Sequence, residues 1–180
     1  MRTGVRVGVD VGSVRVGVST CDPAGILATP VQTLHRGRGD LTALVELVAE
    51  REAVEVVVGL PTSLSGRPGP AAATAQAYAE QLAGRVPVPV RMVDERFSTS
   101  AAQRGLHASG VDTRKGRRVI DQAAAVIILQ SALDAARSTG SAPGRLINVS
   151  PDPTGTMADT STDSPIVDRG PHDTSRRPTR

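Results

Sequence analysis

Carboxylate side chains stand at three places in this chain where they could do chemistry. Asp10 closes the apolar run "VRVGVD", and the pair Asp94–Glu95 follows the apolar run "VPVRMV". A third acid, Asp121, lies inside the apolar stretch "RRVIDQAAAVIILQ". Carboxylate oxygens suit hard cations such as Mg²⁺ or Mn²⁺, and no His or Cys accompanies these acids to suggest zinc. Brought together, they would hold metal ions that activate water for hydrolysis of a phosphodiester bond.

The elements that must position these acids follow from hydrophobic periodicity. Alternating or continuous apolar runs predict strands, and Gly12 with Ser13 between the first two predicts a hairpin. Pro30 limits the third strand to an edge or a strand end, and Asp40 suits the N-cap of the first helix. The predicted strands are 5–10, 14–20, 26–34, 54–61 and 88–94, and the predicted helices are 40–53, 71–84, 99–109 and 117–138.

This order of elements predicts an α/β fold: a five-stranded mixed sheet with helices on both faces. The first, fourth and fifth strands would be parallel, with their carboxyl ends at one edge, where open α/β sheets bind ligands. Residues 1–150 are expected to form one domain. Residues 151–180 contain Pro, Asp, Thr, Ser and Arg with few apolar residues, which predicts a disordered tail.

The last predicted helix has a charged residue on an apolar face. Positions 121, 124, 125, 128 and 132 share one face and read Asp, Ala, Ala, Ile, Ala. An unpaired buried charge is costly, whereas small neighbours let a helix approach a sheet closely. We place Asp121 near the amino end of this helix, where the helix dipole favours an ionised acid. Each acid also has a purely structural alternative: a turn cap for Asp10, an ion pair with Arg96 or the start of the next helix for Asp94 or Glu95, and a dipole acid for Asp121.

Basic residues lie close to these acids. Four of them immediately precede Asp121 and could hold a phosphate backbone, although a solvated, charge-balancing loop is the alternative. These four are Arg114, Lys115, Arg117 and Arg118. Arg15 and Arg96 could orient a reacting phosphate or make simple ion pairs.

Composition narrows the classes of function. The net charge is +3, which suits a polyanionic partner, but Tyr78 and Phe97 are the only aromatic residues. A nucleic-acid platform built on aromatic stacking is therefore not expected. A single cysteine excludes a disulfide framework and a thiolate zinc cluster. No apolar run approaches the roughly 20 residues that a membrane span needs, so we expect a cytoplasmic protein without a membrane partner.

Four segments together resemble the YqgF (RuvX) nuclease family: "VGVDVGSVRVGVS", "VVVGLP" with its Gly-rich loop, "DERFST" and "RKGRRVIDQAAAVIILQSALD". The similarity covers about residues 5–138. It implies a ribonuclease H-like fold related to Holliday-junction resolvases, and a role in maturing the 5′ end of 16S rRNA. Carried over by position, the acidic triad falls on Asp10, Glu95 and Asp121, which would hold Mg²⁺ or Mn²⁺.

Two positions depart from the family pattern. Ser65 stands where the loop after the fourth strand usually carries an acid, and Ala101 where the family often has Glu. Neither touches the triad. Glu95 is preferred over Asp94 because the family match falls there, and because neighbouring residues of a strand point to opposite faces, so that normally only one can reach the metal.

Several functions stay open at this point. The leading one is a metal-dependent nuclease acting on precursor rRNA in ribosome biogenesis, and a resolvase of four-way DNA junctions would use the same chemistry. A catalytically inactive nucleic-acid or ribosome-binding module is a further alternative. A nucleotide-binding protein of the actin–Hsp70–sugar kinase type also opens with a D-x-G hairpin, but it needs a second domain with its own phosphate loop. The oligomeric state is not predicted.

Overall fold

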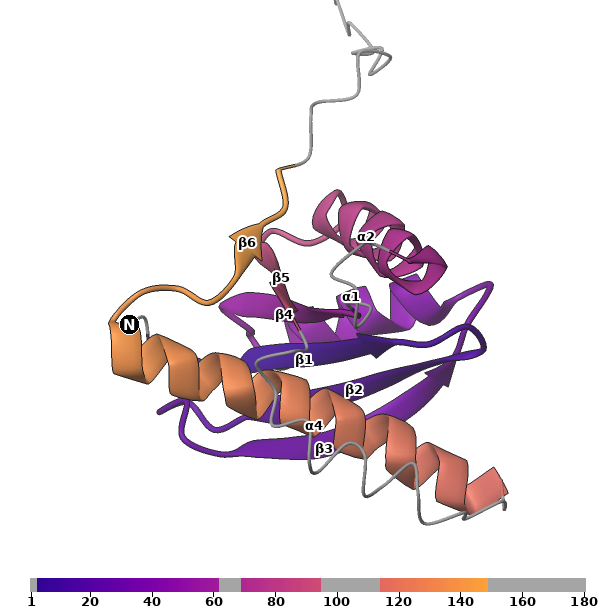
Figure 1. Ribbon diagram of the computed structural model, residues 1–180, viewed down its shortest axis with the longest axis horizontal. Helices are drawn as coiled ribbons and strands as arrows, with labels where there is room; N and C mark the ends of the chain where they lie inside the picture. Colours follow the sequence, from indigo (N-terminus) through magenta and orange to yellow (C-terminus); the bar gives the residue numbers. More distant parts are fainter. Residues whose placement is uncertain (1–2, 62–68, 95–113, 149–180) are drawn as a thin grey trace, which may run out of the picture. The chain divides into compact units, whose positions relative to one another are not determined.

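The computed structural model describes residues 3–61, 69–94 and 114–148, and the side chains of 114–120 are outside this description. Three strands come first, and helices and strands then alternate, in the predicted order apart from a short final strand (Figure 1). The strands are β1 (Arg6–Val11), β2 (Arg15–Cys21), β3 (Ala28–His35), β4 (Glu55–Leu60), β5 (Val90–Asp94) and β6 (Arg145–Leu146). The helices are α1 (Asp40–Glu50), α2 (Pro70–Ala83) and α4 (Arg114–Thr139).

The strands form one mixed sheet in the order β3-β2-β1-β4-β5-β6. β1 and β2 form the predicted antiparallel hairpin, while β1, β4 and β5 are parallel to one another. β3, which contains Pro30, is an edge strand as predicted. The mixed α/β sheet is thus confirmed, and the carboxyl ends of β1, β4 and β5 lie at one edge.

The expected number of five strands was wrong, because the described part of the sheet has six. Arg145 and Leu146 pair with Met92 and Arg91 and add a short strand beside β5. Two residues are too few to show the alternation that identifies a strand in a sequence. The expected N-cap of α1 was also displaced by one residue, since Gly39 takes that position and Asp40 is the first helical residue.

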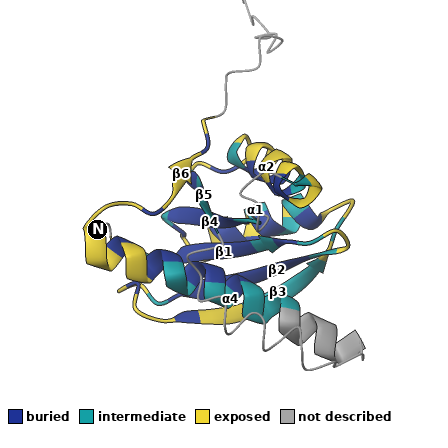
Figure 2. Cartoon of the chain, in the orientation of Figure 1, coloured by how far each residue is buried: buried dark blue, intermediate teal, exposed yellow. Residues whose placement is uncertain are grey.

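The sheet is covered on both faces, as Figure 1 shows: α4 crosses one face, and α1 and α2 cover the other. The larger apolar cluster lies on the α1–α2 face and includes Val9, Leu44 and Leu82. The smaller cluster lies under α4 and includes Val57, Ile128 and Leu129. Burial follows this division, with the central strands largely buried in Figure 2.

Residues 1–149 belong to one compact unit. The predicted helix 99–109 and the predicted disordered tail 151–180 lie outside the described residues, and the domain division stays a prediction. In the part of the chain that the structure describes, no helix is long and apolar enough to span a membrane.

Candidate active site

Asp10 lies on the face of the sheet that α4 covers. Alternate residues of a strand point to opposite faces, and Val7 and Val9 belong to the apolar cluster on the α1–α2 face. Gly8 therefore faces α4, and a Cβ at Gly8 would lie 2.6 Å from the Cβ of Leu129. Asp10, two residues further along β1, points to the same face as Gly8 and is half-buried.

The strand β2 brings Asp121 to the same place. Asp10 pairs with Gly17 across the hairpin, and paired residues of antiparallel strands share a face. The nearest atom to a Cβ built on Gly17 is the main-chain carbonyl oxygen of Asp121. The backbone of Asp121 thus lies directly over Gly17, the strand partner of Asp10. Two acids separated by 111 positions in the sequence come together on one face of the sheet.

Arg15 completes the described part of this site. It lies two residues before Gly17 and so faces α4 as well. Its Nη1 donates a hydrogen bond of 3.2 Å to Oδ2 of Asp121, and the two side chains are 19% and 27% exposed. Sequence reasoning left Arg15 open between a phosphate contact and an ion pair. The structure shows an ion pair whose two side chains remain partly exposed to solvent.

The other predicted site residues are placed only in part. Asp94 ends β5 beside Leu60, at the same edge of the sheet, and lines a cavity of about 300 Å³ with Ser131 and Arg145. Glu95 and Arg96 lie outside the described residues. The side chains of the predicted phosphate-binding residues at the start of α4 are also outside the description: Arg114, Lys115, Arg117 and Arg118.

One expectation about Asp121 was wrong. α4 begins at Arg114, so Asp121 lies about two turns inside the helix and not near its amino end. The dipole acts mainly within the first turn, so it does not explain an acid at this position. Among the residues that the structure describes, the guanidinium of Arg15 is the cation that pairs with the Asp121 carboxylate.

Three residues that sequence reasoning missed hold α4 against the sheet. Gly8 and Gly17 leave room for the helix, and Oγ of the buried Ser19 donates a 2.8 Å hydrogen bond to the carbonyl oxygen of Ala125. The sequence contained a signal for this close packing, because small residues at every second position of β2 match the alanine-rich face of α4. Sequence reasoning interpreted the alanines of the helix but not the small residues of the strand.

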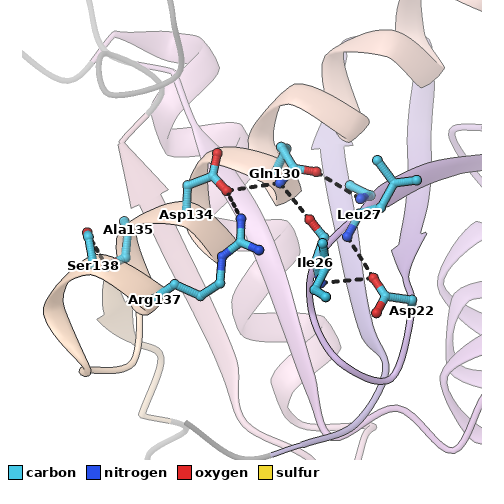
Figure 3. A network of polar contacts seen from close by, with 9 residues as sticks. Asp22, Ile26, Leu27, Gln130, Asp134, Ala135, Arg137 and Ser138 are labelled. Atoms are coloured by element: carbon cyan, nitrogen blue, oxygen red, sulfur yellow. Dashed lines mark hydrogen bonds and ion pairs between the residues drawn. The ribbon is translucent and has the colours of Figure 1, made fainter.

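Further along, Gln130 ties α4 to the loop between β2 and β3 (Figure 3). Its Oε1 accepts a 2.9 Å hydrogen bond from the backbone N–H of Ala28, and its Nε2 donates to the carbonyl oxygen of Ile26 at 3.0 Å. The loop is itself ordered by Asp22, whose carboxylate accepts hydrogen bonds from the backbone N–H groups of Leu27, Ile26 and Ala24. These bonds, led by that from Leu27, hold the pKa of Asp22 below its usual value. The position of α4 along the sheet is therefore fixed.

The donors at this site fit a hard divalent cation. Asp10 and Asp121 supply carboxylate oxygens on one face, and a guanidinium already occupies a cation position beside Asp121. Within residues 3–61, 69–94 and 114–148, no three His, Cys, Asp or Glu side chains gather closely enough to hold a metal. The described residues therefore offer two acids of the predicted triad.

Comparison with known proteins identifies the family of this chain. The family model described as "RuvX: Holliday junction resolvase" matches residues 4–135. The chain belongs to the RuvX family. Proteins named "Putative pre-16S rRNA nuclease" are also similar along most of their length. The relative from Streptomyces coelicolor is 58% identical, covering 83% of this chain and 91% of the relative, and the relative from Nocardioides is 54% identical, covering 82% and 98%.

The fold is shared with a solved resolvase. The structure of Thermus thermophilus RuvC with a Holliday junction substrate matches 80% of this chain and 99% of that chain, with a TM-score of 0.56 and 14% identity. At that identity the likeness shows the fold alone. The expectations of a ribonuclease H-like fold and of a nuclease family are confirmed, and membership of the RuvX family makes the kinase-type alternative untenable.

Proposed function

We propose that this RuvX-family chain is a metal-dependent nuclease that hydrolyses phosphodiester bonds in structured nucleic acid, and that its substrate is the 5′ leader of precursor 16S rRNA. The observation that carries the proposal is the placement of Asp121 over Gly17, the strand partner of Asp10. The names of the relatives from Streptomyces coelicolor and Nocardioides support the choice of substrate.

The roles of the residues follow from this geometry. Asp10 and Asp121 would hold one or two Mg²⁺ or Mn²⁺ ions, with Glu95 as the third acid, as the family resemblance implies. The bound metal would supply activation of water and stabilisation of the leaving oxygen. The carboxylates would fix its position, and α4 would keep water from the side of the site nearest the core.

Arg15 has a separate task in this scheme. It lies beside Asp121 and retains 19% exposure of its side chain, so it can orient a phosphate oxygen while its charge offsets the two acids. Arg96, Arg114, Lys115, Arg117 and Arg118 would hold the neighbouring backbone phosphates through charge, without reading sequence. We place this activity in the cytoplasm and in ribosome biogenesis.

A branched DNA substrate is the second candidate, and the description of the matching family model favours it. The test is cleavage by the full chain, in Mg²⁺, of an end-labelled precursor 16S rRNA leader and of a four-way DNA junction. Cleavage of the leader at a defined position, with the junction left intact, is expected. Cleavage of the junction alone would replace the rRNA assignment by a resolvase, and tight binding without cleavage of either would indicate a non-catalytic module.

A further inference from the structure

Gly17 lies at the closest approach of α4 to the sheet. A Cβ built at this position would come well within 3.0 Å of the carbonyl oxygen of Asp121, nearer than real Cβ atoms approach other atoms. The clashing atom belongs to the helix backbone, so no change of side-chain rotamer can relieve the clash. Any residue other than glycine must therefore move α4 away from β2 at Asp121.

The helix cannot make this movement without loss elsewhere. Ala125 and Leu129 are fully buried on the same face, and Ser19 and Gln130 bond the helix to β2 and to the loop after it. Packing in such an interface is dense, and a gap of even 0.5–1 Å forfeits part of the dispersion energy. The wild-type height of α4 is therefore well defined, and Gly17 is what permits it at the level of Asp121.

The same position determines how the two acids of the site face each other. Asp10 is the strand partner of Gly17, so one short distance, from β2 to the backbone of residue 121, sets how far the Asp121 carboxylate stands from that of Asp10. We infer that Gly17 is a positioning residue of the metal site: its missing side chain sets the height of α4 and thereby the separation of the Asp10 and Asp121 carboxylates. This inference rests on the metal site of the proposed function.

The inference predicts a specific defect in metal binding. Residues that orient metal ligands typically contribute about 10–100-fold to metal affinity. We expect Gly17→Ala to weaken Mn²⁺ binding by about this factor while the protein stays folded. The shift in melting temperature with Mn²⁺, followed over a concentration series with the full chain, gives the dissociation constant through the linkage of binding to stability.

Leu133→Ala is the matched control. Leu133 is a fully buried residue of the same helix, about three turns beyond Asp121, so its truncation destabilises the same interface away from the acids. The control should lower the melting temperature and leave the Mn²⁺ dissociation constant unchanged. An unchanged Mn²⁺ dissociation constant in Gly17→Ala would overturn the inference, and so would equal weakening in both variants.

A longer carboxylate provides a rescue test. If Gly17→Ala raises α4, Asp121→Glu should recover part of the Mn²⁺ affinity in that background, and it should reduce affinity in the wild-type background. Loss of Mn²⁺ affinity by Asp121→Glu in both backgrounds would show that the height of α4 is not the cause of the defect.

If Gly17→Ala does not fold, Ser19→Val replaces it, because two methyl groups under Ala125 would raise the helix one turn away. Undiminished Mn²⁺ affinity in Ser19→Val would then overturn the inference.

Failure of the proposed function would look different. Wild type should be stabilised by Mn²⁺, and Asp121→Asn should remove that stabilisation. If wild type shows no stabilisation, the metal site itself is wrong and Gly17 has nothing to position. If wild type and Asp121→Asn behave as expected and Gly17→Ala matches wild type, only the inference about Gly17 fails.

Discussion

The guanidinium of Arg15 lies 3.2 Å from the carboxylate of Asp121, joining the β1–β2 hairpin to α4 across 106 positions of sequence. The contact places one cation and two acids on the same face of the sheet, since Asp10 lies beside it on β1. A partly exposed ion pair contributes at most about 1 kcal/mol to stability. The ion pair therefore matters mainly for the candidate active site and contributes little to the stability of the fold.

Replacement of Arg15 by alanine should separate substrate binding from metal binding. The ion pair competes with a divalent cation for Asp121, so Arg15→Ala should leave Mn²⁺ affinity unchanged or increase it. The same variant should lower kcat/KM for nucleic acid by about 10-fold or more, the equivalent of losing one charge-assisted hydrogen bond to phosphate. Titration calorimetry with Mn²⁺ and steady-state kinetics measure the two effects. Reduced Mn²⁺ affinity in Arg15→Ala would show that Arg15 supports the acids and does not compete for them.

The opposite end of the sheet contains a buried charge cluster that predicts a large effect on stability. The carboxylate of Glu55 accepts hydrogen bonds from Nε of Arg6 at 3.1 Å and Nε of Arg91 at 2.8 Å, and Arg6 is only 4% exposed. Removal of the carboxylate charge takes away the acid that both guanidinium groups share, and breaking a buried ion pair typically costs about 3–5 kcal/mol. Glu55→Gln should lower the free energy of unfolding in urea by this amount. Glu80→Gln, at an exposed position of α2, is the control and should change it by less than about 0.5 kcal/mol.

Tyr78 gives a prediction for alkaline pH. Burial, reinforced by the negative charge of Asp40, raises the pKa of Tyr78 well above its usual value. The folded state therefore favours the neutral phenol. Stability from this group is complete below the ordinary tyrosine pKa of about 10 and declines as the pH rises above it, because only the unfolded chain then ionises readily.

The chain has a single tyrosine and no tryptophan, so phenolate absorbance reports on Tyr78 alone. In the folded protein this absorbance should appear only together with unfolding, at a pH above 10. Tyr78→Phe should lose less stability than wild type between pH 10 and 11. Reversible ionisation near pH 10 without loss of the folded state would show that the hydroxyl is accessible.

Much of the framework was predictable because it depends on local patterns. The alternation around Asp10 identified a strand, the Gly12–Ser13 turn identified the hairpin, and Pro30 indicated an edge strand. The apolar run ending at Leu60 identified a buried parallel strand. In each case the residue type has a direct physical consequence for the backbone at that position, and no distant contact is needed to interpret it.

The rest depends on distances between segments, which a pattern does not contain. The dipole explanation for Asp121 failed because the helix begins earlier than its apolar stripe suggests. The pairing of Arg15 with Asp121 and the fit of Gly17 under the helix are tertiary contacts between residues that each have several plausible partners. Sequence patterns therefore pointed to candidate acids, and the packing of α4 on β2 places two of them on one face of the sheet.

The most direct test of the central claim is the rate of Mg²⁺-dependent cleavage of the precursor 16S rRNA leader by wild type, Asp121→Asn and Asp134→Asn. Asp134 is exposed on the same helix and pairs with Arg137 at the surface, so its replacement matches the chemical change without touching the site. The account predicts that Asp121→Asn lowers kcat by at least about 100-fold with RNA binding retained, because the interaction it removes serves the transition state. It also predicts a wild-type rate for Asp134→Asn. Cleavage by Asp121→Asn at the wild-type rate would contradict a metal site built on Asp10 and Asp121.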